Sequence, residues 1–399
     1  MPSTAPGPKH AMPARDPLVF VIAGEESGDH LGAALIEAIR IRREGRVTFC
    51  GIGGRAMAAH GVASPFPIDD LAIVGLGIAR KLPLILRRIR QAAAAVVAAR
   101  PDVLVIVDSP DFTHRVARQV RAAAPDIPIV DYVSPSVWAW RPWRARAMRR
   151  YVDHVLALLP FEPAAHAELG GPPCTFVGHP LGERIMTLRP NATEAERRLA
   201  DPPIVLALPG SRRGEIRRML PVFAGAIDIL NQQAGPLEIV LPTVPHLAED
   251  IQRETQRWKR PTRVLVDAGE KRAAFRTARA ALAKSGTVTL ELALAGVPMV
   301  TGYKVSLVEE IIGRRMIRVP SVILANLVLG ENVIPEFLQS DCNPATLANA
   351  LAPLLRDGPE RRRQIEAFAW LDSIMQIGTA RPSDRAAEIV LELAARGRS

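Results

Sequence analysis

Cysteine is scarce in this chain of 399 residues, which contains only Cys50, Cys174 and Cys342. The three lie far apart and lack the spacing of metal ligands, so the sequence supports neither a disulfide framework nor a zinc site. Long apolar runs are missing as well, because charged residues or prolines interrupt each stretch before it reaches the roughly 18 residues of a membrane-spanning helix. We therefore expect a cytoplasmic protein that contacts membranes only peripherally.

Two common nucleotide-binding signatures are also absent. The glycines at positions 24, 28 and 32 follow the first predicted strand, but they lack the G-x-G-x-x-G spacing of a dinucleotide fold. Neither of two later glycine–serine loops ends in the Gly-Lys-Ser/Thr of a Walker P-loop. These absences argue against a Rossmann-type oxidoreductase and against P-loop hydrolysis, and we expect neither a cofactor nor a metal ion.

The composition that remains is that of a folded globular protein, with 48% hydrophobic and 23% charged residues. The length suffices for two domains that each bury a core. Residues 1–17 are rich in proline and polar side chains and predict a disordered tail. The net charge of +10 implies an acidic partner, which could be nucleic acid, a nucleotide substrate or an anionic membrane surface.

Short β-branched runs alternate with helical stretches along the chain, a pattern that predicts parallel sheets covered by helices. The proline-rich stretch 178–203 interrupts the pattern and predicts a junction between two doubly wound α/β domains. We place these domains at 18–185 and 186–365, followed by C-terminal helices over 366–399. Strands are predicted at 18–23, 47–50, 103–107, 129–133, 155–159, 204–208, 237–241, 264–266 and 299–301.

The loop after the first predicted strand is a candidate substrate loop of the first domain. Residues 23–29 read Ala-Gly-Glu-Glu-Ser-Gly-Asp and lead into a helix predicted over 33–40. Ligands of open α/β sheets bind beyond the carboxyl ends of strands, so Ser27, Gly28 and Asp29 are candidate substrate-binding residues.

Asp108 ends the strand predicted at 103–107 and is the candidate general base, because its carboxylate would meet a substrate hydroxyl at the edge of the sheet. The alternative is that Asp108 accepts from backbone donors of the turn. For Asp111 we favour a role in capping the following helix.

A cluster of tryptophans and arginines follows the next predicted strand. Within 132–144, Ser134, Ser136, Trp138 and Arg141 are candidate substrate-binding residues. Aromatic side chains interleaved with arginine can stack on nucleic-acid bases. We favour packing of the tryptophans at a domain or subunit interface, with the arginines serving anionic groups.

Residues 73–90 join apolar residues to a basic run. This composition suits an element that dips into lipid while its arginines meet head groups. The alternative is a core helix with a solvated basic end. The same segment could also contact the acyl chains of a substrate.

Two loops of the second domain are candidate phosphate sites. In the first, Gly210 lets the backbone approach an anion, Ser211 can donate, and Arg212 offers a bidentate fork. In the second, Ser285, Gly286 and Thr287 open a helix whose N-terminus attracts anions. Glu291 follows one turn later as a candidate ribose ligand, and together the loops predict a nucleoside diphosphate site. The alternative is an ordinary helix capped by Ser285 or Thr287, with Glu291 on its solvated face.

In this order the motifs resemble those of the lipid-A-disaccharide synthases, a family of bacterial glycosyltransferases (glycosyltransferase family 19). The resemblance extends over about 20–390 and rests on residues 23–29, 108–112, 132–141, 159–162, 178–180, 208–212 and 285–291.

The resemblance implies a GT-B architecture and an inverting transfer from UDP-2,3-diacylglucosamine to 2,3-diacylglucosamine 1-phosphate. The implied products are UDP and a β-1,6-linked disaccharide 1-phosphate, formed in the cytoplasm by an enzyme peripherally associated with the anionic inner membrane. It further implies that Asp108 takes the proton of the acceptor hydroxyl, that Arg212 stabilises the departing UDP as a second catalytic residue, and that Glu291 grips the ribose.

The chain departs from the family pattern near Asn326, which follows Ala325 where the family usually has proline. We retain Asn326 as a candidate substrate ligand. Members also exchange C-terminal helices between subunits, which implies a homodimer in which 386–396 takes part. The alternative is a terminal helix that folds back on its own domain.

Two other functions are compatible with parts of the sequence. Another GT-B enzyme that uses a UDP-sugar would share the diphosphate loops, but the Ser-Pro-Ser-Val-Trp-Ala-Trp tract at 134–140 argues against a peptidoglycan glycosyltransferase or a UDP-N-acetylglucosamine epimerase. A nucleic-acid-binding protein would explain the charge and the tryptophans but not two diphosphate loops, so we expect no nucleic-acid partner.

Overall fold

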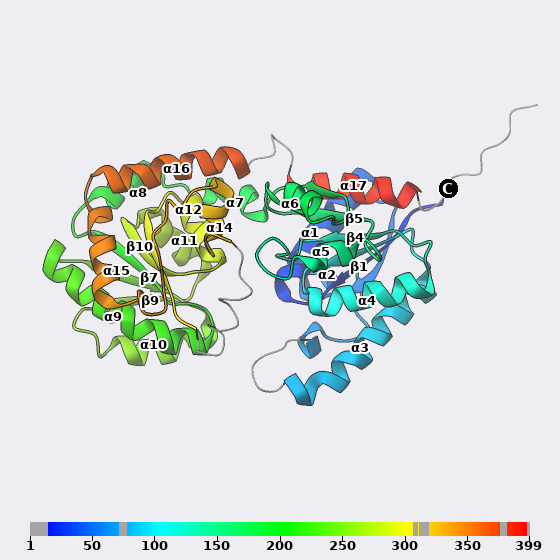
Figure 1. The fold of residues 1–399 in the computed structure, drawn as a ribbon, viewed down its shortest axis with the longest axis horizontal. Helices are drawn as coiled ribbons and strands as arrows, with labels where there is room; N and C mark the ends of the chain where they lie inside the picture. The colour runs from blue at the N-terminus through cyan, green and yellow to red at the C-terminus, as the bar shows by residue number, and fades with distance from the viewer. Residues whose placement is uncertain (1–14, 72–77, 306–309, 311–318, 376–380, 397–399) are drawn as a thin grey trace, which may run out of the picture.

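The chain forms two lobes that lie side by side, each built on a parallel sheet between layers of helices (Figure 1). The computed structural model describes residues 15–71, 78–305, 310, 319–375 and 381–396. The predicted fold class, two doubly wound α/β domains, is confirmed. Among the described residues, no helix combines the length and the hydropathy that a membrane span requires.

The first sheet has six parallel strands in the order β2-β1-β3-β4-β5-β6. Successive residues of β1 face two different cores, with Phe20 and Ile22 in one and Val19 and Val21 in the other. Because both faces are buried, these strands are continuous apolar runs. The strands are β1 (Leu18–Ala23), β2 (Thr48–Ile52), β3 (Val103–Val107), β4 (Ile129–Tyr132), β5 (His154–Ala157) and β6 (Cys174–Phe176).

Helices from both ends of the chain cover the first sheet. Residues of α1, α2 and α17 pack on one face, and residues of α3, α4 and α5 pack on the other. The C-terminal helix α17 lies against α1 of the same chain (Figure 1). The helices are α1 (Glu26–Arg42), α2 (Arg55–Ala59), the 3₁₀ helix η1 (Ile68–Leu71), α3 (Ile78–Ala99), α4 (Pro110–Ala123), α5 (Trp143–Met148), α6 (Glu162–Glu168) and α17 (Pro382–Arg396).

The second sheet also has six parallel strands, in the order β12-β11-β10-β7-β8-β9. Its central strand β10 alternates between two cores, with Ala281 and Ala283 in one and Leu282 in the other. The strands are β7 (Ile204–Leu208), β8 (Glu238–Pro242), β9 (Thr262–Leu265), β10 (Ala280–Lys284), β11 (Met299–Tyr303) and β12 (Glu336–Leu338).

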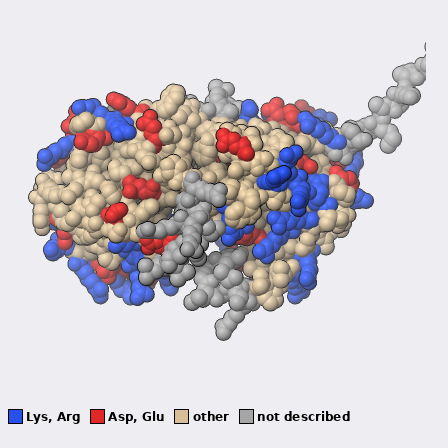
Figure 2. Space-filling model, in the orientation of Figure 1, with Lys and Arg blue, Asp and Glu red and all other residues tan. Residues whose placement is uncertain are grey.

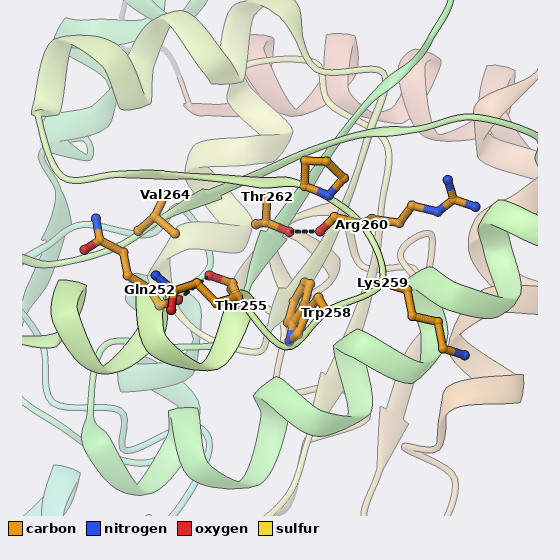
Figure 3. Close-up of a pocket in the computed structure, with 9 residues that line it drawn as sticks. Gln252, Thr255, Trp258, Lys259, Arg260, Thr262 and Val264 are labelled. Carbon is orange, nitrogen blue, oxygen red and sulfur yellow. Dashed lines mark hydrogen bonds between the residues drawn. The ribbon is translucent and has the colours of Figure 1, made fainter.

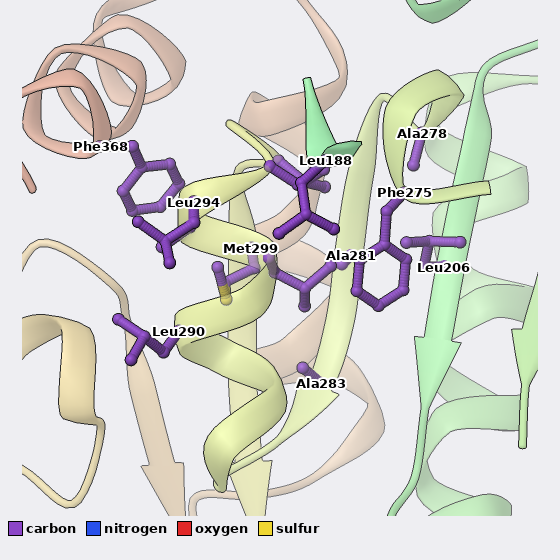
Figure 4. Packing of buried hydrophobic residues seen from close by; sticks show 14 of the residues in the cluster. Leu188, Leu206, Phe275, Ala278, Ala281, Ala283, Leu290, Leu294, Met299 and Phe368 are labelled. Carbon is purple, nitrogen blue, oxygen red and sulfur yellow. The ribbon is translucent and has the colours of Figure 1, made fainter. Parts of the chain in front are cut away.

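One core of the second lobe packs α12 against the sheet. Figure 4 shows Leu290 and Leu294 of this helix beside Met299 of β11 and Phe368 of α16. The helices of this lobe are α8 (Ala192–Leu199), α9 (Arg213–Ala234), η3 (Pro245–Leu247), α10 (Ala248–Thr255), α11 (Ala268–Thr277), α12 (Thr287–Leu294), α14 (Leu324–Leu329), α15 (Pro344–Leu351), η4 (Ala352–Leu355) and α16 (Pro359–Met375).

Helix α7 (Pro180–Leu188) lies at the junction between the lobes. It contacts α11 and α12 of the second lobe and α17 of the first. Leu159, at the end of the segment after β5, belongs to the same core as Leu188 of α7, and Trp138 packs against that core. An ion pair between Arg189 and Asp372 also ties the segment after α7 to α16.

The bounds of β1, β3 and β7 agree with the predicted strands, whereas β6, β10 and β12 were not predicted. The prediction that a loop leads into a helix at 33–40 is wrong, because α1 begins at Glu26. The glycines of α1 permit this helix to pack closely against β3, since a Cβ at Gly28 would lie 3.0 Å from the Val107 carbonyl oxygen. Most of the predicted tail (1–14) and residues 73–77 of the apolar and basic segment 73–90 lie outside the described residues.

Candidate functional site

The strand order of the first sheet changes direction between β1 and β3, and the loops after these two strands meet. The Ser27 hydroxyl, in the first turn of α1, donates to Asp108 Oδ2 at 3.0 Å. The Ser109 backbone N–H donates to Asp108 Oδ1 at 2.8 Å. Such a switch point is the usual ligand site of an open α/β sheet, and the structure brings the predicted residues Ser27 and Asp108 together there.

The turn that holds Asp108 is backbone-strained. Asp108 and Ser109 have φ values of 53° and 47°, in the left-handed region that L-residues other than glycine seldom adopt. A Cβ at Gly24 would lie 2.6 Å from Ser109 Cβ, so the two loops also pack tightly. Strain of this kind is concentrated at functional sites. Asp108 accepts a hydrogen bond from a backbone N–H of the turn, which is the alternative role considered for it. Its half-buried carboxylate can still accept further hydrogen bonds.

Asp29 faces the start of α2 rather than the switch point. Its buried carboxylate accepts from the backbone N–H groups of Gly54, Ala56 and Met57 at 2.7, 2.8 and 3.1 Å. The Asp29 carboxylate therefore caps the N-terminus of α2, although Asp29 itself belongs to α1. This contact gives Asp29 a structural role, and its role as a substrate ligand stays a prediction, as does that of the buried Gly28.

The loop after β4 is held by α6. The Ser134 hydroxyl is hydrogen-bonded to Nε2 of the buried His166 at 2.8 Å. The Trp138 indole N–H donates to Glu162 Oε1 at 3.1 Å, and the Trp138 ring meets Phe161 edge to face with centroids 5.0 Å apart. The loop is therefore fixed at two points, and Trp138 packs where the lobes meet, as its interface interpretation predicts.

Glu162 is the buried acceptor on which this arrangement depends. Its Oε2 accepts from the backbone N–H groups of Leu158 and Leu159 at 3.1 and 2.9 Å. Burial raises the pKa of Glu162 to about 7, against the opposing effect of these donors and of Trp138. A carboxylate so placed ties the segment after β5 to the loop after β4.

Further along that loop the side chains are more exposed. Arg141 lies over the Trp140 ring at 4.2 Å, and Arg144 lies 5.8 Å from the same ring. Arg144 also donates to Asp111 Oδ1 at 3.0 Å, so Asp111 pairs with an arginine instead of capping α4. Ser136 is exposed. The surface beside the switch point is therefore basic and aromatic.

The second sheet has its own switch point, between β7 and β10. Helix α9 follows β7 and α12 follows β10, and neither N-terminus has a side-chain cap. The residue before α12 is Gly286, so the alternative interpretation, an ordinary helix capped by Ser285 or Thr287, is wrong. Two open helix N-termini at one switch point form a suitable site for a diphosphate.

Glu215 and Lys284 join the two loops of this switch point. The Ser211 backbone N–H donates to Glu215 Oε2 at 3.1 Å, and Lys284 Nζ lies 3.1 Å from Glu215 Oε1. Burial alone would raise the pKa of Glu215, but the Lys284 ammonium and the hydrogen bonds lower it overall. Gly210 has a φ of 124°, and a Cβ there would lie 2.5 Å from Glu215 Oε2. The loop thus requires glycine at this position.

The remaining predicted ligands of this switch point differ in exposure. The Arg212 side chain is 82% exposed and lies 3.7 Å from Glu215, so its guanidinium can turn toward an incoming anion. Thr287 is exposed and Ser285 is buried. Glu291 is half-buried and accepts from Lys271 Nζ of α11 at 2.9 Å. Glu291 is therefore held in place by a lysine and does not lie free on a solvated face.

Asn326 is enclosed by its own lobe. Its amide nitrogen donates to the Ile334 carbonyl at 3.0 Å, and its amide oxygen accepts from the Ile334 N–H at 2.9 Å. The buried amide thus ties α14 to the segment before β12. A direct contact with substrate stays a prediction for this residue.

A pocket of about 540 Å³ adjoins the N-terminus of α12. Ser285 and Gly286 line it together with residues of β11 and β12. By contrast, the pocket of about 580 Å³ in Figure 3, lined by Trp258, Lys259 and Arg260, lies at the amino-terminal end of β9. Because ligands of such sheets bind at the carboxyl ends of strands, the pocket beside α12 is the better candidate.

Comparison with known proteins identifies the family. A family model described as lipid-A-disaccharide synthetase matches residues 19–390. The chain is 61% identical over 388 residues to the lipid-A-disaccharide synthase of Nitrobacter winogradskyi, covering 97% of this chain and 98% of that relative. The chain belongs to the lipid-A-disaccharide synthase family. The family is one of glycosyltransferases, so the predicted enzyme class is confirmed.

Solved structures share the two-lobed architecture at low identity. An S. aureus MnaA–UDP co-structure has a TM-score of 0.61 at 13% identity, covering 94% of this chain and 97% of that one. Acinetobacter baumannii MurG has a TM-score of 0.56 at 17% identity, covering 94% and 99%. These similarities confirm the GT-B fold.

Sequence reasoning missed several residues that position the site. Four of them bond to predicted ligands, namely Glu162, Glu215, Lys271 and Glu336, and the fifth, Lys284, pairs with Glu215. A local signal existed for Glu215, which lies four residues after Ser211 in the first turn of α9. Acidic residues favour such positions because of the helix dipole. No local pattern could pair Lys284 with Glu215, since they meet only in the folded sheet.

Proposed function

We propose that this enzyme transfers the sugar of UDP-2,3-diacylglucosamine to the 6-hydroxyl of 2,3-diacylglucosamine 1-phosphate. The products would be the β-1,6-linked disaccharide 1-phosphate and UDP. The observation that carries the proposal is the second switch point, where two uncapped helix N-termini are joined through Glu215 and Lys284. Membership of the family supplies the reaction class.

The donor nucleotide would bind at this switch point. The N-termini of α9 and α12 would hold the two phosphates, with Ser211 and the residues Ser285–Thr287 as further donors. Glu291, fixed by Lys271, would accept from the ribose hydroxyls. Arg212 is exposed and would close on the diphosphate as a bidentate donor.

Inversion requires one in-line displacement. The acceptor oxygen forms its bond to the anomeric carbon as the bond from that carbon to the phosphate oxygen breaks, and the electron pair leaves with UDP. Asp108 takes the proton of the acceptor hydroxyl, because its carboxylate is half-buried and held by Ser27 and Ser109. The helix N-termini and Arg212 stabilise the negative charge that develops on the leaving diphosphate.

The first lobe would meet the anionic membrane at the cytoplasmic face of the inner membrane. In Figure 2 basic side chains gather over α4 and α5, where Arg115 and Arg146 are exposed. On α3, the exposed Leu82 and Leu86 lie close in sequence to the exposed Arg87. An apolar row beside basic residues suits an interface with anionic head groups.

Incubation of the purified chain with both acylated substrates in detergent tests the proposal. Mass spectrometry should detect the disaccharide 1-phosphate and an equal amount of UDP. A folded protein that yields neither product would refute it. Parallel assays with UDP-N-acetylglucosamine test the alternative GT-B enzymes, and salt-dependent RNA binding tests the nucleic-acid alternative.

The proposal includes a homodimer formed by exchange of C-terminal helices. Helix α17 packs against α1 within one chain, and the proposal takes these two surfaces as the ones that exchange. Sedimentation of the full chain, compared with a chain lacking α17, distinguishes a dimer from a monomer with a self-packed terminal helix.

A further inference from the structure

We infer that the pocket beside α12, here called the β11–β12 pocket, receives the sugar of the donor and that Glu336 accepts a hydrogen bond from a hydroxyl of that sugar. The inference rests on the proposed function, since it presupposes a nucleotide-linked sugar at the second switch point. It adds a binding pocket and a recognition residue that sequence patterns did not indicate.

The position of the pocket follows from the two ends of the nucleotide. Glu291 and Lys271 lie at the α11 side of α12 and would hold the ribose, while the helix N-termini would hold the phosphates. The sugar is attached to the outer phosphate, so it must lie beyond the helix N-termini that hold the two phosphates. Ser285 and Gly286 belong both to the phosphate loop and to the pocket wall, so the pocket is continuous with the phosphate site.

The lining suits an acylated sugar. Tyr303, Val322 and Leu338 supply apolar surface, whereas Ser285, Ser321 and Glu336 supply polar atoms. The volume of about 540 Å³ lies in the range of small-molecule sites, which combine mostly apolar walls with a few placed polar groups.

Glu336 keeps acceptor capacity on the oxygen nearer the phosphate loop. Its Oε2 accepts from the Ser321 hydroxyl at 3.1 Å and from the Val322 N–H at 3.3 Å. Its Oε1 accepts from the Ser285 hydroxyl at 3.4 Å, a long bond. A carboxylate offers about four acceptor positions, so Oε1 can also take a sugar hydroxyl. Burial raises the pKa of this carboxyl, and a polar ligand would offset the cost of keeping a charge there.

A single substitution separates this role from a structural one. In Glu336→Gln, the Val322 N–H must still find an acceptor, so the amide oxygen takes the place of Oε2 and the NH₂ group takes the place of Oε1. The pocket then loses the negative charge of Glu336 while the side chain keeps its size, and the carboxylates of Glu310 and Asp341, which also line the pocket, are unchanged. Glu331→Gln is the matched control, because Glu331 is exposed and pairs only loosely, at 3.7 Å, with Arg363.

Calorimetric titration with UDP and with UDP-2,3-diacylglucosamine provides the readout. We expect Glu336→Gln to weaken donor binding about tenfold, as for a lost hydrogen bond to a charged group, and to leave UDP binding within about twofold of wild type. Glu331→Gln should change neither.

Two outcomes would overturn the inference. Equal weakening of UDP and donor would mean that Glu336 acts only through Ser285 on the phosphate loop. Unchanged binding of both ligands would mean that the sugar lies elsewhere. A wild-type chain that binds both ligands but forms no disaccharide would instead contradict the proposed function, so the two failures are distinguishable.

Discussion

The buried carboxyl of Glu162 makes the stability of the first lobe depend on pH near neutrality. Glu162→Gln keeps the volume of the side chain but removes its titration. In the native protein burial raises the pKa of Glu162 from 4.5 to about 7, whereas in the unfolded chain it returns to its ordinary value. The folded state therefore holds the proton more tightly than the unfolded state between these two values.

The sign and size of the effect follow from proton linkage. Stability falls with rising pH where the folded state binds more protons, so wild type should lose stability relative to Glu162→Gln from about pH 4.5 to about pH 7. Below this window both states are protonated, and above it both are ionised. A difference of about 2.5 pKa units corresponds to about 3 kcal/mol in all.

Urea denaturation of both proteins at a series of pH values measures this difference, because other titrating groups contribute equally to each. Glu162→Gln also alters the three hydrogen bonds that the carboxylate accepts, and this adds a contribution to the stability difference that does not come from titration. The change of the stability difference with pH is therefore the informative quantity. A carboxyl ¹³C titration, compared between the two proteins, gives the pKa directly. A stability difference that stays constant from pH 4.5 to 8 would refute the reasoning.

Three further substitutions test named contacts. Asp108→Asn should lower turnover by about 10²- to 10⁴-fold, whereas the exposed Asp111→Asn should not; near-normal turnover of folded Asp108→Asn would contradict the base assignment. Glu291→Ala should weaken UDP binding by about tenfold or more in calorimetry, and unchanged affinity would exclude a ribose contact. Asp29→Ala should cost about 3 kcal/mol in urea denaturation by leaving three backbone donors unpaired, and Asp29→Asn should cost less.

Strands that are buried on both faces were predictable from the sequence. In β1, β3 and β7 the β-branched and leucine runs have sharp ends, because each strand is followed by a polar or glycine-bearing loop. Strand β10 was missed because its residues Ala280–Lys284 are mostly alanine, which has little strand preference. Alanine nevertheless occurs at this central strand, where both faces are fully packed. Edge strands β6 and β12 have three residues each and carry too little pattern.

The start of α1 was missed for a different physical reason. Gly28 and Gly32 look like loop residues in one dimension, but in the fold they let the helix approach β3 and Met57. A Cβ at Gly32 would lie 2.8 Å from Met57 Sδ. Such contacts depend on tertiary packing, which outweighs the low helix propensity of glycine.

Apart from Glu215, the partners of the predicted site residues could not be read from local patterns, yet all of them share one physical principle. Loops at the ends of parallel strands expose backbone N–H groups that the sheet no longer pairs, and these loops have little apolar surface to hold them. Here buried carboxylates accept hydrogen bonds from such N–H groups. Asp29 accepts from Gly54, Glu162 from Leu158 and Leu159, and Glu215 from Ser211.

The same principle explains why a buried carboxylate is tolerated beside a site for an anionic ligand. Glu215 would repel a diphosphate if its charge stood alone, but Lys284 lies 3.1 Å away and offsets it. Removing Lys284 would leave the buried carboxylate next to the phosphates with only the exposed Arg212, at 3.7 Å, to offset its charge, whereas removing both Lys284 and Glu215 would leave the Ser211 N–H without its acceptor. The pair thus fixes the loop geometry without adding net charge, so the attraction for the diphosphate must come from the helix N-termini and from Arg212.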